Sequence, residues 1–128
     1  MRSGQEEANL RLVERVFAQV LAPMDSQTVE GLFAPGFVQH NPGMASGVPA
    51  LKDGLDRVKA ACPRATYSVK RMMADGDLVM AHVHAIFEPG DPGVAVVNIF
   101  RVENGLIAEH WDVVQPVETK PKNGNGQL

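Results

Sequence analysis

The chain has 128 residues, of which 45% are hydrophobic, and this size suits one domain with a real core but not two. Twelve Lys and Arg against 15 Asp and Glu give a net charge of −3 without any basic run, so we expect neither a nucleic-acid partner nor an anionic membrane partner. No apolar stretch is long enough for a signal-peptide core or a membrane span, which predicts a cytoplasmic protein.

The first half of the chain is predicted to be mainly helical, because apolar residues recur there at helical spacing between prolines. Ser3 and Glu6 fit a capping box at the start of the first helix, and Pro23 ends that helix. The single cysteine, Cys62, excludes an internal disulfide and is expected to be a small buried hydrophobe. The further elements predicted in this half are a helix over 26–33, a brief strand over 37–40 and a helix over 49–61.

The second half is predicted to be a sheet. Asp75-Gly76 and Asn104-Gly105 are dipeptides that favour two-residue hairpin turns, and Pro89–Gly93 must form a longer loop. The segments between these turns are apolar, β-branched and of strand length. The sequence therefore predicts a meander of four antiparallel strands, at about 65–74, 77–88, 94–103 and 106–116.

The turns also predict which side chains share a face of the sheet. If Ala74 faces Asp77, cross-strand partners have a constant sum of residue numbers. His84 then lies opposite Tyr67, and His82 shares the face of His84.

The same reasoning at the second tight turn places Asn98 opposite Trp111. His110 and Asp112 then lie on the other face, unless a β-bulge intervenes. A shift of one residue would reverse that division.

Three helices followed by a twisted antiparallel sheet make an α+β fold of about four long strands and one short one. The helices can cover only part of such a curved sheet, so the two together are expected to enclose a cone with one internal pocket. We expect a single domain over residues 1–117. The tail, residues 118–128, has no apolar residue before its last and is predicted to be disordered.

Three stretches together resemble the SnoaL-like branch of the nuclear transport factor 2-like superfamily. They are QHNP at Gln39–Pro42, ADGD at Ala74–Asp77 and NIFRVENGLIAEHWDVVQP at Asn98–Pro116, and the resemblance extends over about residues 8 to 117. It implies a cone-shaped fold. The same cone occurs in ketosteroid isomerases, polyketide cyclases, epoxide hydrolases, dehydratases and non-catalytic binding proteins, so fold alone does not choose among them.

The resemblance also implies roles for single positions. Asn98 stands where the cyclases carry an acid/base aspartate and the isomerases a protonated aspartate of the oxyanion hole. An amide cannot act as a base there, but it can donate a hydrogen bond to an enolate oxygen. The His40-Asn41 pair lies near the position of the isomerases' proton-shuttling carboxylate, and His40 is the only titratable group there. His82 and His84 replace the Arg and the acidic residue of the epoxide hydrolases, which counts against epoxide hydrolysis.

These positions predict a cofactor-free enolisation site, with His40 as base, Asn98 as hydrogen-bond donor and His84 as an orienting or relaying group. The alternative for each lone histidine is a satisfied core or interface residue, and a structural pair is the alternative for His110 with Asp112. The residues predicted to bind the substrate are Tyr67, His82, Met80, Phe100, Trp111, His110 and Asp112.

The predicted function is therefore isomerisation, aldol-type cyclisation or dehydration of a small apolar carbonyl compound, with no cofactor. The alternative is a non-catalytic ligand-binding or dimerisation module. His82-x-His84 followed by Glu88 also resembles the first half of a cupin metal motif, but the second half is missing, so a His-x-His metal-binding protein is kept only as a minor alternative and no metal is assigned to the site. We expect a homodimer through the outer face of the sheet, to which Val97, Ile99, Val113 and Val114 are assigned.

Overall fold

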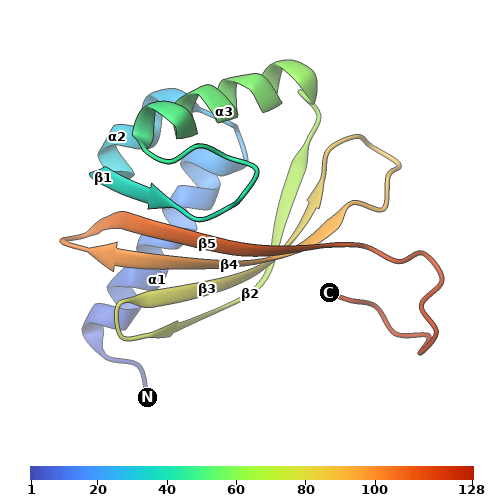
Figure 1. Cartoon of the computed structure of the whole chain (residues 1–128). Helices are drawn as coiled ribbons and strands as arrows, with labels where there is room; N and C mark the ends of the chain where they lie inside the picture. The colour runs from blue at the N-terminus through green and yellow to red at the C-terminus, as the bar shows by residue number, and fades with distance from the viewer.

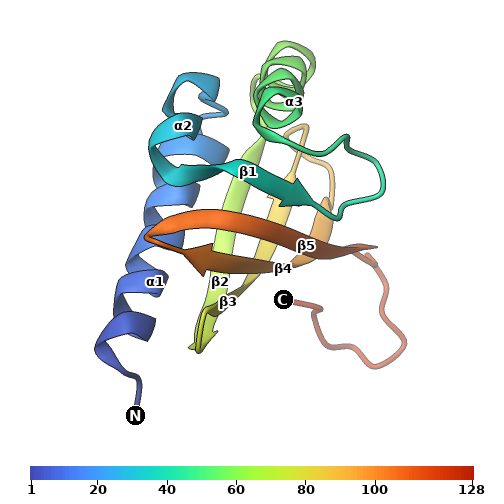
Figure 2. The same ribbon diagram turned by 60° about the vertical axis from the view of Figure 1, so that its left-hand side comes forward.

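The computed structural model describes residues 1–128 as three α-helices on one side of a curved sheet of five strands (Figures 1 and 2). The predicted α+β fold is confirmed. The helical elements are α1 (Gly4–Val16), a π-helical turn (Phe17–Leu21), a 3₁₀ turn (Ser26–Thr28), α2 (Val29–Leu32) and α3 (Val48–Ala61). The strands are β1 (Phe33–Gln39), β2 (Thr66–Asp75), β3 (Leu78–Ile86), β4 (Val94–Glu103) and β5 (Leu106–Pro116).

The predicted capping box at the start of α1 is confirmed. The Ser3 hydroxyl accepts a hydrogen bond from the Glu6 N–H at 3.1 Å, and the Glu6 carboxylate accepts one from the Ser3 N–H at 2.8 Å. The other Glu6 oxygen accepts a hydrogen bond from the Gly76 N–H at 2.9 Å. These hydrogen bonds lower the pKa of Glu6, and the bond to the Ser3 backbone is the largest cause. The cap thus ties the start of α1 to the β2–β3 turn.

The strand order is β1-β5-β4-β3-β2, and the predicted antiparallel meander of β2 to β5 is confirmed. The sheet as a whole is mixed, because β1 pairs with β5 in parallel (Figure 2). This corrects the expectation of a purely antiparallel sheet. The expected helix over 26–33 is also shorter than predicted, because Phe33 already has extended backbone geometry and begins β1.

Two β-bulges change the predicted register. One lies in β2 between Val69 and Arg71, and the turn after β2 begins one residue later than assumed. Tyr67 therefore pairs with Ala85, and the prediction that it lies opposite His84 is wrong. Tyr67 and His84 consequently point to opposite faces of the sheet.

The second bulge lies in the β4–β5 hairpin, where Ala108 is the additional residue. Asn98 pairs with Asp112, so the prediction that it lies opposite Trp111 is wrong. His110 and Asp112 share the face of Asn98, which is the reversal that a bulge was expected to cause. This single extra residue determines which polar side chains face the helices.

The helices and the inner face of the sheet form one core. Buried side chains of α1 belong to the same hydrophobic cluster as those of β3, β4 and β5, and Phe17 of the π-helical turn meets Phe100 edge to face, with ring centroids 5.9 Å apart. Cys62 packs against this core at the end of α3 and is half-buried. No helix is long and apolar enough to cross a membrane.

Residues 117–128 form neither helix nor strand. They curve back toward the end of β5 (Figure 1), where the Gln127 amide donates to the Gln115 side chain at 2.7 Å and to the Pro116 carbonyl at 3.1 Å. The predicted disorder of this tail stays a prediction.

Candidate active site

A cavity of about 320 Å³ lies between the helices and the inner face of the sheet. Of its 23 lining residues, 17 are hydrophobic, so the walls suit a largely apolar ligand. The π-helical turn, α3 and strands β1 to β5 all contribute side chains. The polar residues that line the cavity are Gln39, Asn41, Tyr67, Asn98, His110 and Asp112.

Asp112 is the only charged residue in the cavity wall. The amide nitrogen of Asn41 donates to both carboxylate oxygens of Asp112, at 2.9 and 2.8 Å. The Asn41 amide oxygen in turn accepts a hydrogen bond from the Gly43 N–H at 2.8 Å. That backbone donor fixes the orientation of the amide, so its NH₂ group must face the carboxylate. The pair therefore presents one held carboxylate to an apolar cavity.

His110 lies two residues earlier on β5 and is neutral at physiological pH. Burial lowers its pKa to about 4, with His40 adding to the decrease and Asp112 opposing it. Its Nδ1 is 2.8 Å from the Gln39 side-chain oxygen, and its Nε2 is 2.9 Å from the Asn98 side-chain oxygen. A neutral imidazole has one N–H only, so one of these two amides must turn its NH₂ group toward the ring.

The neighbouring contacts indicate which amide donates. The Gln39 oxygen also accepts the Asn41 backbone N–H at 3.1 Å, which holds Gln39 as the acceptor for the Nδ1–H of His110. Asn98 then donates to the Nε2 of His110. The contact that it gives up is a long one, 3.4 Å from its amide to the Ala81 carbonyl. Gln39, His110 and Asn98 thus form one hydrogen-bonded chain across β1, β5 and β4.

Tyr67 supplies a further donor. Its ring lines the cavity and packs edge to face with Phe87, at a centroid distance of 6.3 Å, and its hydroxyl has no hydrogen-bond partner in the protein. Burial raises the pKa of Tyr67, with a smaller contribution from Cys62, so the phenol stays protonated. An O–H without a partner can donate to a ligand oxygen.

Five of the predicted site residues line the cavity together: Tyr67, Asn98, Phe100, His110 and Asp112. Gln39 and Asn41 complete the polar group, and they were not among the predicted site residues. Two signals in the sequence could have indicated them: the alternation Gln39-x-Asn41 before Pro42, and the QHNP stretch of the family resemblance, in which Asn41 follows His40. Without knowledge of the parallel pairing of β1 with β5, neither signal shows that Gln39 and Asn41 lie beside His110 and Asp112.

The predicted base, His40, is not in the cavity wall. Its Nε2 is 2.5 Å from a Glu109 carboxylate oxygen, and its ring stacks on Trp111 with centroids 4.8 Å apart. The other Glu109 oxygen accepts a hydrogen bond from Arg101 at 2.9 Å. This lowers the pKa of Glu109, with the bond from Arg101 as the largest cause and His40 as the next. The cluster lies on the outer face of the sheet, opposite Asp112 and His110.

The histidines of β3 and Met80 also lie outside the cavity wall, because they alternate with the inward-facing residues of that strand. His82 contacts Arg71, and the Nε2 of His84 is 2.7 Å from the Pro92 carbonyl oxygen. No group of three His, Cys, Asp or Glu side chains is arranged to hold a metal ion. The structure therefore places no third metal-ligating side chain beside His82 and His84.

Comparison with known proteins places this fold among characterised families. A family model described as a SnoaL-like domain matches residues 13–110. The structure is similar to a candidate polyketide cyclase from Bacillus cereus ATCC 10987, with a TM-score of 0.76, 18% identity and coverage of 89% of this chain and 79% of that one. A candidate SnoaL-like polyketide cyclase from Jannaschia sp. CCS1 gives a TM-score of 0.75, 20% identity and 90% coverage of both chains.

A third similar structure is a candidate isomerase of the SnoaL-like family from Agrobacterium tumefaciens str. C58, with a TM-score of 0.72, 13% identity and coverage of 85% of this chain and 98% of that one. No curated protein sequence matches this chain. At these identities the solved structures show a shared fold and nothing finer.

Proposed function

The chain belongs to the SnoaL-like domain family, and we propose that it is a cofactor-free acid–base enzyme that enolises an apolar carbonyl compound. The observation that carries the proposal is the Asp112 carboxylate, held by Asn41 at the wall of an otherwise apolar cavity. A carboxylate in such surroundings is a suitable base for a proton α to a carbonyl group. Several structures of similar fold are described as candidate polyketide cyclases or isomerases, which agrees with this chemistry.

In the proposed reaction, Asp112 removes the α-proton, and the electron pair of the broken C–H bond moves onto the carbonyl oxygen. The Tyr67 hydroxyl donates a hydrogen bond to the resulting enolate oxygen. Donors aimed at a developing oxyanion typically contribute about 10²- to 10³-fold in rate. His110 has both ring nitrogens engaged with amides, so its role is to hold Asn98 and Gln39 in place.

The enolate is the common intermediate of the reactions considered for this chain. Return of the proton from Asp112 to a different carbon gives isomerisation. Attack of the enolate carbon on a second carbonyl group gives aldol-type cyclisation, and loss of a β-hydroxyl group gives dehydration. The proposal covers these isomerase, cyclase and lyase outcomes and rests on their shared first step.

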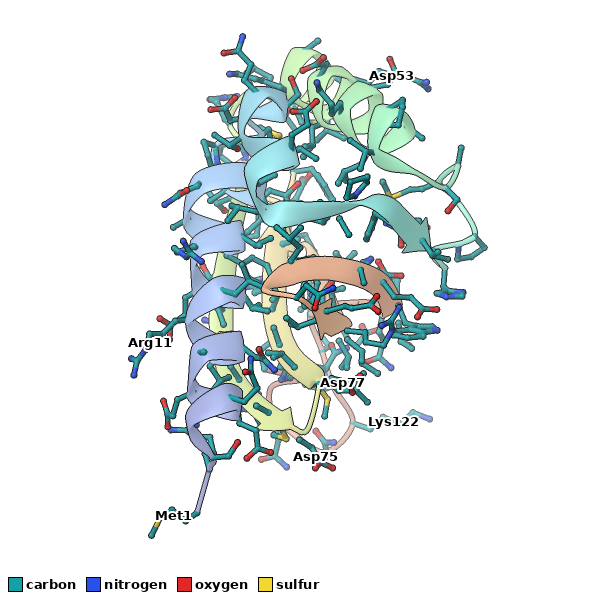
Figure 3. The ribbon with its side chains drawn as sticks, turned by 90° about the vertical axis from the view of Figure 1, so that its left-hand side faces the viewer. Met1, Arg11, Asp53, Asp75, Asp77 and Lys122 are labelled. Carbon is teal, nitrogen blue, oxygen red and sulfur yellow. The ribbon has the colours of Figure 1, made fainter.

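Proton NMR in D₂O tests that step directly. The wild-type protein is incubated with cyclic ketones, β-diketones and polyketide-like carbon acids, and loss of the α-proton signal is followed over time. We expect Asp112→Asn to slow the exchange at least about 100-fold, because it removes the base and keeps the shape. Asp75→Asn is the matched control, since Asp75 is exposed at the β2–β3 hairpin (Figure 3) and does not line the cavity.

Exchange that survives in Asp112→Asn at the wild-type rate would remove Asp112 from the mechanism. If the wild-type protein exchanges no compound of the panel, the non-catalytic alternative, a small-ligand-binding or dimerisation module of this fold, takes the place of the enzyme.

A homodimer through the outer face of the sheet is a further part of the proposal. Val97 and Ile99 on β4 alternate with the inward-facing residues there, and Val113 on β5 is 71% exposed. Val114, which was assigned to the same face, lines the cavity instead. The remaining expectation, a cytoplasmic location, stays part of the proposal.

A further inference from the structure

The cavity has an uneven charge distribution. Its 23 lining residues include neither Lys nor Arg, and Asp112 is its only charged side chain. His110 is uncharged at physiological pH, because burial lowers its pKa to about 4. The polar end of the cavity therefore carries one negative charge and no positive one.

Four basic residues lie on or beside α3, and three of them are paired on the surface. Lys52 donates to Glu30 at 2.6 Å, and Arg64 contacts Glu88 at 3.4 Å. Arg57 pairs with Asp53, four residues earlier on the same helix. None of these three basic side chains lines the cavity. Lys59, the fourth, is exposed and also lies outside the cavity wall, so an anionic ligand would meet no basic side chain there.

The N-terminus of α3 supplies no compensating N–H groups to the cavity either. The first turn of α3 would be the natural place for an anion to meet free N–H groups, but residues 48–50 do not line the cavity, and the wall from α3 begins at Leu51. The Leu51 N–H is itself bonded to the Gly47 carbonyl at 3.0 Å.

We propose that this cavity selects uncharged ligands and rejects carboxylates of the same shape, and that Asp112 is the residue that decides. The inference deepens the proposed function by naming the charge class of its substrate: a neutral ketone, ester or amide. A buried ligand carboxylate would lose its hydration and face the Asp112 charge across a few ångströms of low-dielectric space. A neutral carbonyl compound meets neither cost and can accept the Tyr67 hydrogen bond.

A pair of probes of nearly equal size tests the proposal by calorimetry at neutral pH. The probes are 2-acetylnaphthalene, which is neutral, and 2-naphthoic acid, which is ionised under these conditions. We expect the wild-type protein to bind the ketone about 10- to 100-fold more tightly than the acid. In Asp112→Asn the ratio should fall by about threefold or more, because the repelling charge is gone and only the desolvation cost of the carboxylate remains. The control variant Asp75→Asn should keep the wild-type ratio.

The wild-type comparison needs no variant, so it holds even if Asp112→Asn folds poorly. Equal or tighter binding of the acid would overturn the proposal, as would a wild-type protein that binds neither probe. An unchanged ratio in a folded Asp112→Asn would remove Asp112 as the deciding residue. Selectivity for the ketone without any α-proton exchange would support this inference and contradict the proposed enolisation. Tight binding of carboxylates together with exchange of their α-protons would support enolisation and contradict this inference.

Discussion

His110 is a half-buried histidine held between two side-chain amides. Folding takes His110 out of water and keeps it neutral, while a His in the unfolded chain has a pKa near 6.5. The folded-state pKa of about 4 lies below that value. Between pH 4 and pH 6.5, His110 is therefore protonated in the unfolded chain but not in the folded one. Above pH 6.5 the titration of His110 therefore costs no stability, and the free energy of unfolding falls as the pH decreases from 6.5 toward 4.

We therefore predict that the free energy of unfolding falls by about 3 kcal/mol between pH 7 and pH 4 through His110 alone. Urea denaturation at a series of pH values measures this. The variant His110→Asn should be less stable at pH 7 but should lose much less stability on acidification. His82→Asn, on the outer face, is the matched control and should keep the wild-type slope. An equal slope in wild type and His110→Asn would contradict the assignment.

At the scale of elements, the edge formed by β1 and β5 builds the site. Three consecutive residues of the chain attach to β5: Gln39 to His110, His40 to Glu109 and Asn41 to Asp112. They alternate between the faces of the sheet, so two of them shape the cavity wall and the middle one is fixed outside. A contact on the outer face can in this way support the geometry inside.

This arrangement changes what is expected of His40. The base predicted from the sequence was His40, and loss of the base in His40→Ala would abolish turnover. Because His40 lies outside the cavity, and an exposed pair such as His40 with Glu109 contributes only about 0–1 kcal/mol, we now predict that the exchange rate falls by at most about fivefold. The NMR exchange assay measures this, with thermal unfolding to confirm that the variant folds. Complete loss of exchange in a folded His40→Ala protein would restore His40 as the base.

The loop between β3 and β4 depends on a glycine. Gly93 has a φ of +77°, and a Cβ there would lie 2.3 Å from the Ala85 carbonyl oxygen. Gly90 in the same loop also has a positive φ, of +94°, but its Cβ would meet open space. We predict that Gly93→Ala destabilises the protein by about 3 kcal/mol or more and Gly90→Ala by about 1–2 kcal/mol, because only the first adds a clash to the backbone strain. Thermal or urea unfolding of both variants checks this, and equal losses would contradict it.

At the scale of the whole molecule, the helices cover one face of the sheet and leave the other open (Figures 2 and 3). The open face carries the stacked rings of His40 and Trp111 beside exposed apolar side chains such as Val113. If two copies of the chain pack through this face, related by a two-fold axis, each buries the same surface and a dimer results.

We predict a homodimer at micromolar concentration in sedimentation velocity, and a shift toward monomer in Val113→Lys, which places a charge on the open face. Val69→Lys is a matched control, because Val69 is exposed but pairs with Val83, which faces the cavity, and so does not lie on the open face. Wild-type protein that sediments as a monomer would contradict the dimer.

The sequence by itself determined the elements of this protein. Turn dipeptides at Gly76 and Gly105 mark tight turns whatever surrounds them, and helical spacing between prolines located α1 and α3 closely. These signals are local, because they depend on backbone preferences of neighbouring residues. The family resemblance was confirmed by the match to a SnoaL-like domain. The stretches that carry it, residues 39–42, 74–77 and 98–116, lie in turns and strands of the sheet.

Only the tertiary structure decided which side chains form the site. One additional residue, Ala108, turns His110 and Asp112 toward the cavity, and no hydrophobic pattern distinguishes that bulge from a regular strand, since Ile107 and Ala108 are both buried. The parallel pairing of β1 with β5 joins residues about seventy positions apart, so nothing near Asn41 in the sequence reveals its contact with Asp112. Local signals fix the strands, but the facing of their side chains depends on a register that only long-range packing sets.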